Sequence, residues 1–495
     1  MVLDAFAMVF TPTVLLVVLG GTILGILFGV IPGLTATMGV ALSLPISFGM
    51  DPIPGLALLL GVYVGGANGG LIVSILFNMP GTPSNIATVW DGYPMTLKGE
   101  AGRALGVGIL FSFLAGIIAF MMLIMIAPPV ARFALRFAPF EYFAVTFFAI
   151  TLIATLSGDD LLKGILAGVV GVSFSLFGGA PVDFYMRYTF GLWQLATGFH
   201  LLSVLVGFFA INEMIQSAGN KHNVRKFGNV AFKLKGFGLS MKEFIGQIPN
   251  LIRSTLLGVG IGVLPGIGGS VSNVVAYGVA KNASKTPEKF GTGVIDGVIA
   301  PEAANSGTVG GAMIPLLTLG IPGDAVTAII LGGLMMHGVI PGPMMFVINA
   351  DIIWAVFICL MLANVVMICV QYYGIRGFIK LLRIPRPILL AVVICLCVIG
   401  AFGLNFQIFD VHAMFIFSAI GFAFAKFKMP LPPVILGFIL GDILETNLRR
   451  GLMMTGGDFM PFLTSPIAAF FLILGVGAFT FSVIKNMRRN RKKAA

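Results

Sequence analysis

Long apolar stretches without Asp, Glu, Lys or Arg alternate with short charged segments along the chain. A helix needs about 20 mostly apolar residues to cross a membrane, and several stretches have that length. The first two are longer and contain Pro and Gly, whereas 411–425 and 429–441 are short enough to be tilted, partial or re-entrant. The pattern predicts an all-α polytopic membrane protein with about 10–13 transmembrane helices, some of them broken or re-entrant. The stretches run 5–50, 52–90, 104–131, 142–158, 164–182, 188–212, 254–280, 303–323, 325–350, 352–375, 387–409, 411–425, 429–441 and 459–484.

Four Pro-Gly breaks interrupt the apolar stretches. The first and third lie 233 residues apart in matching contexts, and the second and fourth lie 242 residues apart. Two ordered pairs at nearly equal offsets predict an internal duplication. Pro and Gly leave backbone groups unpaired at membrane depth, which is tolerated only where protein or a water-filled cavity surrounds them. Paired broken segments are typical of transporter binding sites, and ordinary packing of helices through glycine is the alternative. The breaks are Pro32-Gly33, Pro80-Gly81, Pro265-Gly266 and Pro322-Gly323.

The duplication predicts the domain organisation. Residues 1–216 form a first transmembrane repeat, and 251–484 form a second repeat with an added terminal span. The segments 217–250 and 485–495 are rich in Lys and Arg, and basic clusters beside apolar spans mark the cytoplasmic side. We therefore predict a cytoplasmic linker and a cytoplasmic C-terminus. The N-terminal segment has Asp4 and no basic residue, which favours the outside and, with it, inverted repeats.

The composition adds exclusions. Of the 495 residues 58% are hydrophobic and 10% are charged, whereas soluble domains carry about 25% charged residues. The formal net charge is +11, but the basic residues flank apolar spans, where membrane lipids with anionic headgroups attract them and no nucleic acid is required. The four cysteines have no zinc-site or CxxC spacing. We expect no metal site and no cofactor.

Polar residues gather at the breaks. In the segment 80–88, Pro83 suits the first position of a helix and Thr82 suits the N-cap before it. The amides of Ser84, Asn85 and Ile86 are predicted to point out of this helix start, which attracts a carboxylate. Similar polar residues follow the third break, where Ser270 is the candidate cap, and simple capping without a ligand is the alternative. The candidate substrate-binding residues are Pro32, Gly33, Thr35, Thr37, Pro80, Gly81, Thr82, Ser84, Asn85, Thr88, Pro265, Gly266, Gly268, Gly269, Ser270, Ser272, Asn273, Pro322 and Gly323.

A second group of polar residues lies close to the second break of each half. Amide, hydroxyl and carboxylate oxygens suit Na+, and a carboxylate can also carry H+. Glu302 follows Pro301, which favours a helix start and an electrostatic role there. Asp324 is a candidate N-cap, and an acid beside an anion site needs neutralisation by a cation or a proton. The candidates for the coupling ion are Asn68, Glu302, Asn305, Ser306, Thr308 and Asp324.

Charged residues at the end of a later apolar stretch have a simpler interpretation. Glu445 and Arg449 are four residues apart, the spacing of an ion pair on one helix face. Asp442 lies in the same segment. An ion pair at a helix end is therefore predicted here rather than a transport site.

Several chemistries have no counterpart in the sequence. No Gly-Lys dipeptide occurs, so a Walker A loop is excluded, and neither HExxH nor GxSxG is present. We predict that the chain is not an enzyme and that any charged substrate moves with an ion gradient. A passive channel and a standalone carboxylate carrier are the alternatives, and a membrane-embedded enzyme is a third.

The motifs resemble, in order and over nearly the whole chain, the large membrane subunit of the tripartite tricarboxylate transporter family, the TctA type. The resemblance lies in both halves and near the end of the chain. The matching stretches are Gly29-Val-Ile-Pro-Gly33, Pro80-Gly-Thr-Pro83 through Asp91-Gly-Tyr-Pro-Met95, Ala101-Gly-Arg-Ala-Leu105, Gly262-Val-Leu-Pro-Gly-Ile-Gly-Gly269, Ala300-Pro-Glu-Ala-Ala-Asn305, Leu319-Gly-Ile-Pro-Gly323, His337-Gly338 through Pro341-Gly-Pro343, Leu448-Arg-Arg450 and Gly456-Gly-Asp458.

The resemblance implies a secondary active transporter for organic carboxylates, driven by symport of Na+ or H+. It also implies two partners, a small TctB-type membrane subunit and a periplasmic substrate-binding protein of the TctC type. The implied location is the bacterial inner membrane. The implied binding residues lie on the matching loops, chiefly Thr82, Ser84, Asn85 and the segment from Gly266 to Asn273.

Overall fold

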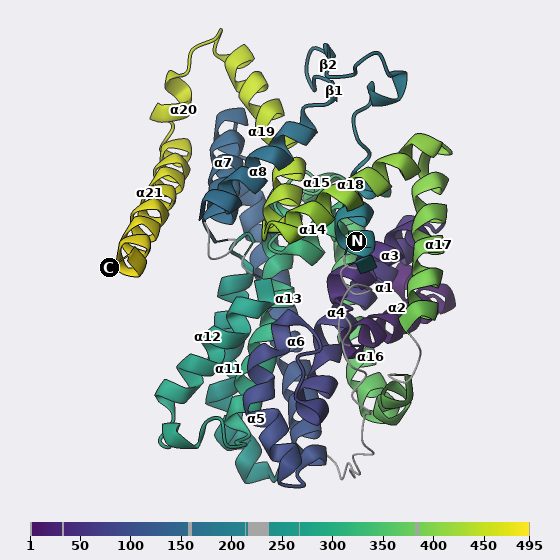
Figure 1. The fold of residues 1–495 in the computed structure, drawn as a ribbon, viewed down its shortest axis with the longest axis vertical. Coiled ribbons are helices and arrows are strands. Elements are labelled where there is room, and N and C mark those ends of the chain that lie inside the picture. Colours follow the sequence, from purple (N-terminus) through teal and green to yellow (C-terminus); the bar gives the residue numbers. More distant parts are fainter. Residues whose placement is uncertain are drawn as a thin grey trace. The chain divides into compact units, whose positions relative to one another are not determined.

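The computed structural model is mostly helical (Figure 1). It describes residues 2–494 except 32–33, 157–160, 213, 216–236, 267 and 382–385. In this part of the chain seven helices are long and apolar enough to cross a membrane, and five shorter apolar helical segments accompany them. The strands found in the same ranges are two residues long each. The predicted all-α polytopic membrane protein is confirmed.

The chain folds into two compact units, each built from two separate stretches. Unit 1 comprises 1–129 and 213–400 and contains all four breaks. Its helices are α1 (Val2–Val9), α2 (Pro12–Val30), α3 (Ala36–Phe48), α4 (Pro52–Phe77), η1 (Pro83–Asn85), α5 (Ile86–Leu97), α6 (Ala101–Ala134, which continues into unit 2), α11 (Met241–Gly262), α12 (Gly268–Ala283), η4 (Pro287–Lys289), α13 (Asp296–Leu319), α14 (Ala325–Met336), α15 (Met345–Ile348), α16 (Ala350–Leu381) and α17 (Arg386–Asn405, which also continues into unit 2).

Unit 2 comprises 130–212 and 401–495. Within it α8 and α21 both pack against α7, and α19 packs against α7 and α8. Its elements are α7 (Pro139–Leu156), α8 (Leu161–Ser175), β1 (Gly178–Gly179), β2 (Met186–Arg187), η2 (Trp193–Leu195), α9 (Leu201–Leu205), the π-helix η3 (Val206–Ile211), α18 (Ile408–Lys426), α19 (Leu431–Met454), α20 (Met460–Thr464) and α21 (Pro466–Ala494).

The predicted ion pair on α19 is confirmed. Arg449 Nε lies 2.7 Å from Glu445 Oε1, one helical turn away. Arg187 of β2 adds a two-pronged contact to the same carboxylate, at 2.6 and 3.0 Å, and Arg449 also bonds Asp183. These ion pairs between side chains connect the loop around β1 and β2 to α19. They give Glu445 a structural role.

Close backbone contacts join α2 to α4 and α11 to α13. A side-chain carbon added to Gly25 of α2 would meet the carbonyl oxygen of Val62 at 2.3 Å, and one added to Gly258 of α11 would meet that of Ala304 at 2.2 Å. The two contacts are equivalent, because Gly25 and Gly258 lie 233 residues apart and Val62 and Ala304 lie 242 residues apart, the offsets of the breaks. Glycine is required in both helices because a neighbouring backbone occupies the space of a side chain.

The same correspondence extends to the breaks. A side-chain carbon on Gly81 would meet the carbonyl oxygen of Gly29 at 2.5 Å, and one on Gly323 would meet that of Gly262 at 2.5 Å. The second break of each half therefore folds back onto the helix that ends at the first break of that half. These contacts support the internal duplication. The domain boundaries and the inversion of the repeats stay predictions.

The predicted linker, 217–250, lies partly outside the described residues. Its last part, from Met241 onward, forms the first turns of α11. Ser240 and Glu243 close a capping box at this helix start, which satisfies amides that have no partner within the helix.

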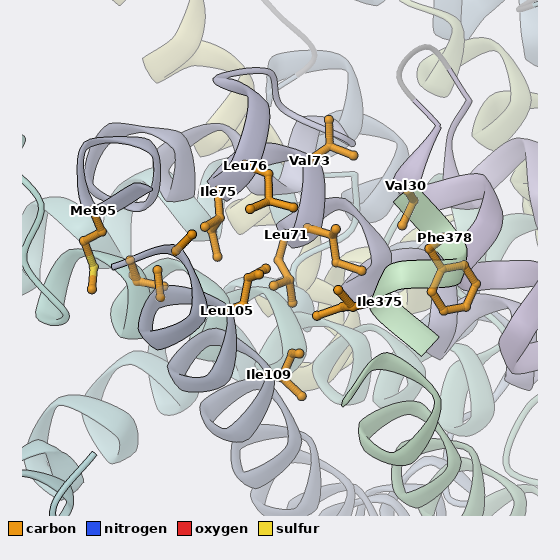
Figure 2. Close-up of a cluster of buried hydrophobic side chains, with 14 of the residues drawn as sticks. Val30, Leu71, Val73, Ile75, Leu76, Met95, Leu105, Ile109, Ile375 and Phe378 are labelled. Carbon is orange, nitrogen blue, oxygen red and sulfur yellow. The ribbon is translucent and has the colours of Figure 1, made fainter. Parts of the chain in front are cut away.

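Apolar side chains hold the middle of unit 1 together (Figure 2). Leu71 and Leu76 of α4 face Leu105 of α6, and α16 contributes Phe378. Between helices in a membrane, close van der Waals packing stabilises such a cluster, because lipid tails are as apolar as the side chains. The cluster fixes α4 and α6, which carry residues of the site, against α5 and α13.

Candidate functional site

The second break of the first half forms a short polar helix start. Thr82 occupies the N-cap position with extended backbone, and Pro83 opens η1, as predicted. The backbone amide of Asn85 donates to Thr82 O at 3.0 Å. Contrary to the prediction, it is therefore not available to a ligand. The Thr82 hydroxyl donates to Asn85 Oδ1 at 2.6 Å rather than capping an amide. Because Oδ1 faces Thr82, the side-chain nitrogen Nδ2 of Asn85 faces α13.

Glu302 of α13 accepts a hydrogen bond from Nδ2 of Asn85. Its carboxylate is fully buried, and Oε1 accepts from Asn85 Nδ2 at 2.9 Å and from the Thr88 hydroxyl at 2.5 Å. Ser112 of α6 donates to Oε2 at 3.3 Å. The expected helix start at Pro301 is wrong: α13 begins at Asp296 and continues through the proline. Glu302 therefore points from inside one helix to the start of another, where its charge meets polar side chains.

Asn273 holds the other side of this helix start. Its Oδ1 accepts from the amide of Ala87 at 2.8 Å, one of the first-turn amides that have no partner within a helix. Asn273 is fully buried, yet its Nδ2 has no hydrogen-bond partner among the residues that the structure describes. A buried donor without a partner costs about 1–3 kcal/mol. An unpaired donor beside a helix N-terminus is suited to an anionic ligand.

Polar pairs mark the contact between α4 and α13. Ser306 donates to Asn68 Oδ1, and Asn305 Nδ2 donates to the carbonyl of Ala67, each at 2.8 Å. All of these side chains are buried. The amide and hydroxyl groups therefore join the long helices of the two halves directly.

The second break of the second half begins α14. Asp324 forms the predicted N-cap, accepting from the Thr327 amide at 2.7 Å and completing a capping box with Thr327. The other oxygen accepts from the Tyr63 hydroxyl of α4 at 3.0 Å. Gly266 N donates to Gly323 O at 2.8 Å, which ties the third break to the fourth.

Further contacts link the helix starts to one another. A side-chain carbon on Gly269 would lie 2.7 Å from Ser84 Oγ and 2.9 Å from Asn305 Oδ1. One on Gly268 would lie 3.5 Å from Asp324 Cβ. The start of α12 therefore lies between the starts of α5 and α14.

The remaining candidates differ in their positions. Ser272 and Thr308 share a hydrogen bond of 2.6 Å between α12 and α13, and Thr35 caps α3 through the Met38 amide. Ser270 lies in the first turn of α12 rather than before it, since this helix begins at Gly268, and Thr37 lies likewise within α3. Pro80 is exposed, whereas Pro265 and Pro322 are buried. Pro32 and Gly33 lie outside the described residues.

Three residues of the network are absent from the sequence prediction. Tyr63 lies at the position equivalent to the candidate Asn305, 242 residues earlier, so the repeat offset could have found it. No sequence feature indicates a role for Ser112 on α6. Gln371 of α16 donates to Asn68 O at 2.8 Å, and its polar side chain in a charge-free stretch was the one available clue.

Asp91 is a structural acid close to the site. Its buried carboxylate accepts from the backbone amides of Gly291, Gly293 and Val294 at 2.7–3.0 Å and from the Tyr277 hydroxyl at 2.8 Å. These bonds fasten the loop before α13 to α5. Asp91 thereby holds the helix that carries Glu302 against the helix start that Glu302 contacts.

The arrangement defines a class of protein: a multi-pass helical membrane protein in which broken helices meet around buried polar groups. The chain belongs to the TctA family, because the model of the family described as "Tripartite tricarboxylate transporter TctA family" matches residues 15–436. This membership makes it a tricarboxylate transporter subunit of the multi-pass membrane type.

Two proteins of Agrobacterium vitis are similar to this chain. One, described as "Uncharacterized 52.8 kDa protein in TAR-I ttuC' 3'region", is 36% identical over 476 residues, which is 96% of this chain and 94% of that protein. The other, described as "Uncharacterized protein in TAR-II ttuC' 3'region", is 35% identical over 231 residues, which is 47% of this chain and 96% of that protein. No solved structure matches.

Proposed function

We propose that this chain is the large translocating subunit of a binding-protein-dependent secondary transporter that imports di- or tricarboxylates or related organic acids. It is not an enzyme in this proposal. Its partners are a small membrane subunit and a periplasmic substrate-binding protein, and it lies in the inner membrane with the C-terminus in the cytoplasm. Family membership supports the class, and the unpaired Asn273 Nδ2 at the start of α5 is the observation that carries the substrate site.

The substrate carboxylate binds at this helix start. The helix dipole places partial positive charge there, and Asn273 Nδ2 supplies a donor that no group in the described part of the chain uses. Ser84, half-buried and close to Gly269, adds a hydroxyl. Because the starts of α5, α12 and α14 come from both halves of the chain, a movement of one half against the other opens the site to alternate sides.

The direct test replaces Asn273 by Asp. The new side chain keeps an oxygen for the Ala87 amide, so the protein folds, but it places negative charge where the carboxylate binds. Uptake of labelled citrate, succinate and benzoate is measured in proteoliposomes that contain the chain, its small subunit and its binding protein, with an imposed Na+ or H+ gradient. We expect wild-type accumulation and at least a tenfold loss in Asn273→Asp.

A matched control is Asn447→Asp on α19, whose side-chain amide donates to Ile443 O of its own helix. This variant should accumulate substrate as the wild type does. Full uptake by Asn273→Asp would reject the site. Downhill flux without gradient or binding protein would support a passive channel instead.

A further inference from the structure

Glu302 is a buried carboxylate without a positive partner. No ion pair of the described residues includes it. Several titratable groups on the elements around α13 bond other residues: Arg103 bonds Glu243, Arg253 bonds Asn250, Tyr277 bonds Asp91 and Tyr63 bonds Asp324. Lys242 and Lys281 are exposed. The contacts of Glu302 are three neutral side chains, those of Asn85, Thr88 and Ser112. A buried carboxylate in such surroundings favours a neutralising cation or a proton.

The donors around Glu302 are poor ligands for Na+. Na+ requires oxygen ligands, but the group of Asn85 that faces Oε1 is the amide nitrogen, because Asn85 Oδ1 is engaged by Thr82. Thr88 also directs its hydrogen to Oε1. The second oxygen, Oε2, has one long contact with Ser112 Oγ, at 3.3 Å. A proton on Oε2 would find an acceptor in this hydroxyl oxygen.

The charge of Glu302 and the proposed substrate site meet at one helix turn. Residues 85–88 contact Glu302 through the side chains of Asn85 and Thr88, and they contact Asn273 through the amide of Ala87. Two like charges so close in a medium of low polarity repel strongly. An anion therefore binds this turn more tightly when Glu302 is neutral.

We propose that Glu302 is the residue that takes up the coupling proton of this transporter. Water on the side of higher proton concentration delivers the proton to Oε2, the neutral carboxyl group permits the anionic substrate to bind at α5, and both leave on the other side. The inference rests on the proposed function and names the ion and its carrier. Binding of substrate and proton is then reciprocal, each raising the affinity of the other.

The test measures binding of citrate, succinate and benzoate to the purified full-length chain from neutral to alkaline pH, where the probe carboxylates stay ionised. Wild-type affinity should fall about tenfold per pH unit once Glu302 is deprotonated. Glu302→Gln, which mimics the protonated carboxyl group, should bind with an affinity independent of pH. Glu141→Gln, at a buried acid of unit 2 that bonds Ser465 and the Ala138 amide, should retain the wild-type slope.

A second variant guards against misfolding of Glu302→Gln. Thr88→Val removes the hydroxyl donor to Oε1 and disfavours the charged form, so the pH at which affinity begins to fall should rise. A wild-type slope in Glu302→Gln, an unmoved midpoint in Thr88→Val, or a wild-type requirement for Na+ without pH dependence would each overturn the proton assignment while leaving the proposed transport intact. If none of the three probes binds to the wild type, the substrate site itself is rejected, and the inference with it.

Discussion

The helix starts that follow Pro80-Gly81 and Pro322-Gly323 occupy equivalent positions, 242 residues apart, but carry different chemistry. In the first, Thr82 and Asn85 are neutral, and the carboxylate comes from Glu302 on α13. In the second, Asp324 supplies its own carboxylate. Its partner from the first half is the hydroxyl of Tyr63 on α4.

The difference teaches how the two halves depend on each other. Each helix start is completed by a side chain from the long buried helix of the other half, α13 for α5 and α4 for α14. Asp324 has a full set of capping bonds, so its charge is stabilised locally. Glu302 accepts from three side chains and, among the described residues, from no backbone amide. The exchangeable charge of our proposal therefore lies at the first start, and the capped charge lies at the second.

The largest expected effect falls on both helix starts alike. Gly81→Ala would place a carbon 2.4 Å from Gly70 Cα, and Gly323→Ala would place one 2.5 Å from the Gly262 carbonyl oxygen. Because backbone must move in each case, we expect the free energy of unfolding to fall by about 3 kcal/mol, the upper end of the usual cost of overpacking. The loss would appear as a lower thermal unfolding temperature in detergent. Gly20→Ala and Gly260→Ala, where nothing lies within 4 Å, should stay within about 1 kcal/mol of the wild type. Equal behaviour of all four variants would contradict the backbone contacts.

A smaller effect should separate the two starts. Asn85→Ala removes a donor from the buried Glu302 carboxylate and should cost about 1–3 kcal/mol. Asp324→Asn keeps an oxygen for the Thr327 amide and turns its side-chain nitrogen to the Tyr63 hydroxyl, whose oxygen can accept. It remains a good N-cap residue, so its cost should stay below about 1 kcal/mol. Thermal unfolding of the two variants side by side checks this. A larger loss in Asp324→Asn would reverse the roles assigned to the two starts.

The smallest effect concerns the partner from the first half. Tyr63→Phe removes one hydrogen bond to Asp324, whose carboxylate keeps its Thr327 partners. We expect a loss of about 1 kcal/mol, measured by the same thermal unfolding. The double variant with Asp324→Asn should lose less free energy of unfolding than the sum of the two single losses, because the residues are in contact. Full additivity would show that the hydrogen bond contributes nothing.

Much of the fold could be read from local features of the sequence. Apolar stretches predict the membrane helices, and Asp324 and Thr82 occupy the N-cap positions that their residue types favour. The repeat offsets also predict which glycines meet backbone, since Gly25 and Gly258 make equivalent contacts. Such features depend on residues close in sequence or on a copied pattern. The start expected at Pro301 failed because buried packing of α13 outweighs the local preference of proline.

The sequence by itself determined the class of protein, the places where its helices break and the polar residue types beside each break. Only the tertiary structure decided which of these residues meet. Asn85 reaches Glu302 across 217 positions of the chain, and Ala87 reaches Asn273 across 186. Contacts over such separations depend on how α5, α12 and α13 pack, and no local preference carries that information. For the same physical reason, the unpaired donor of Asn273 and the unpaired charge of Glu302 emerge only when the helices are assembled.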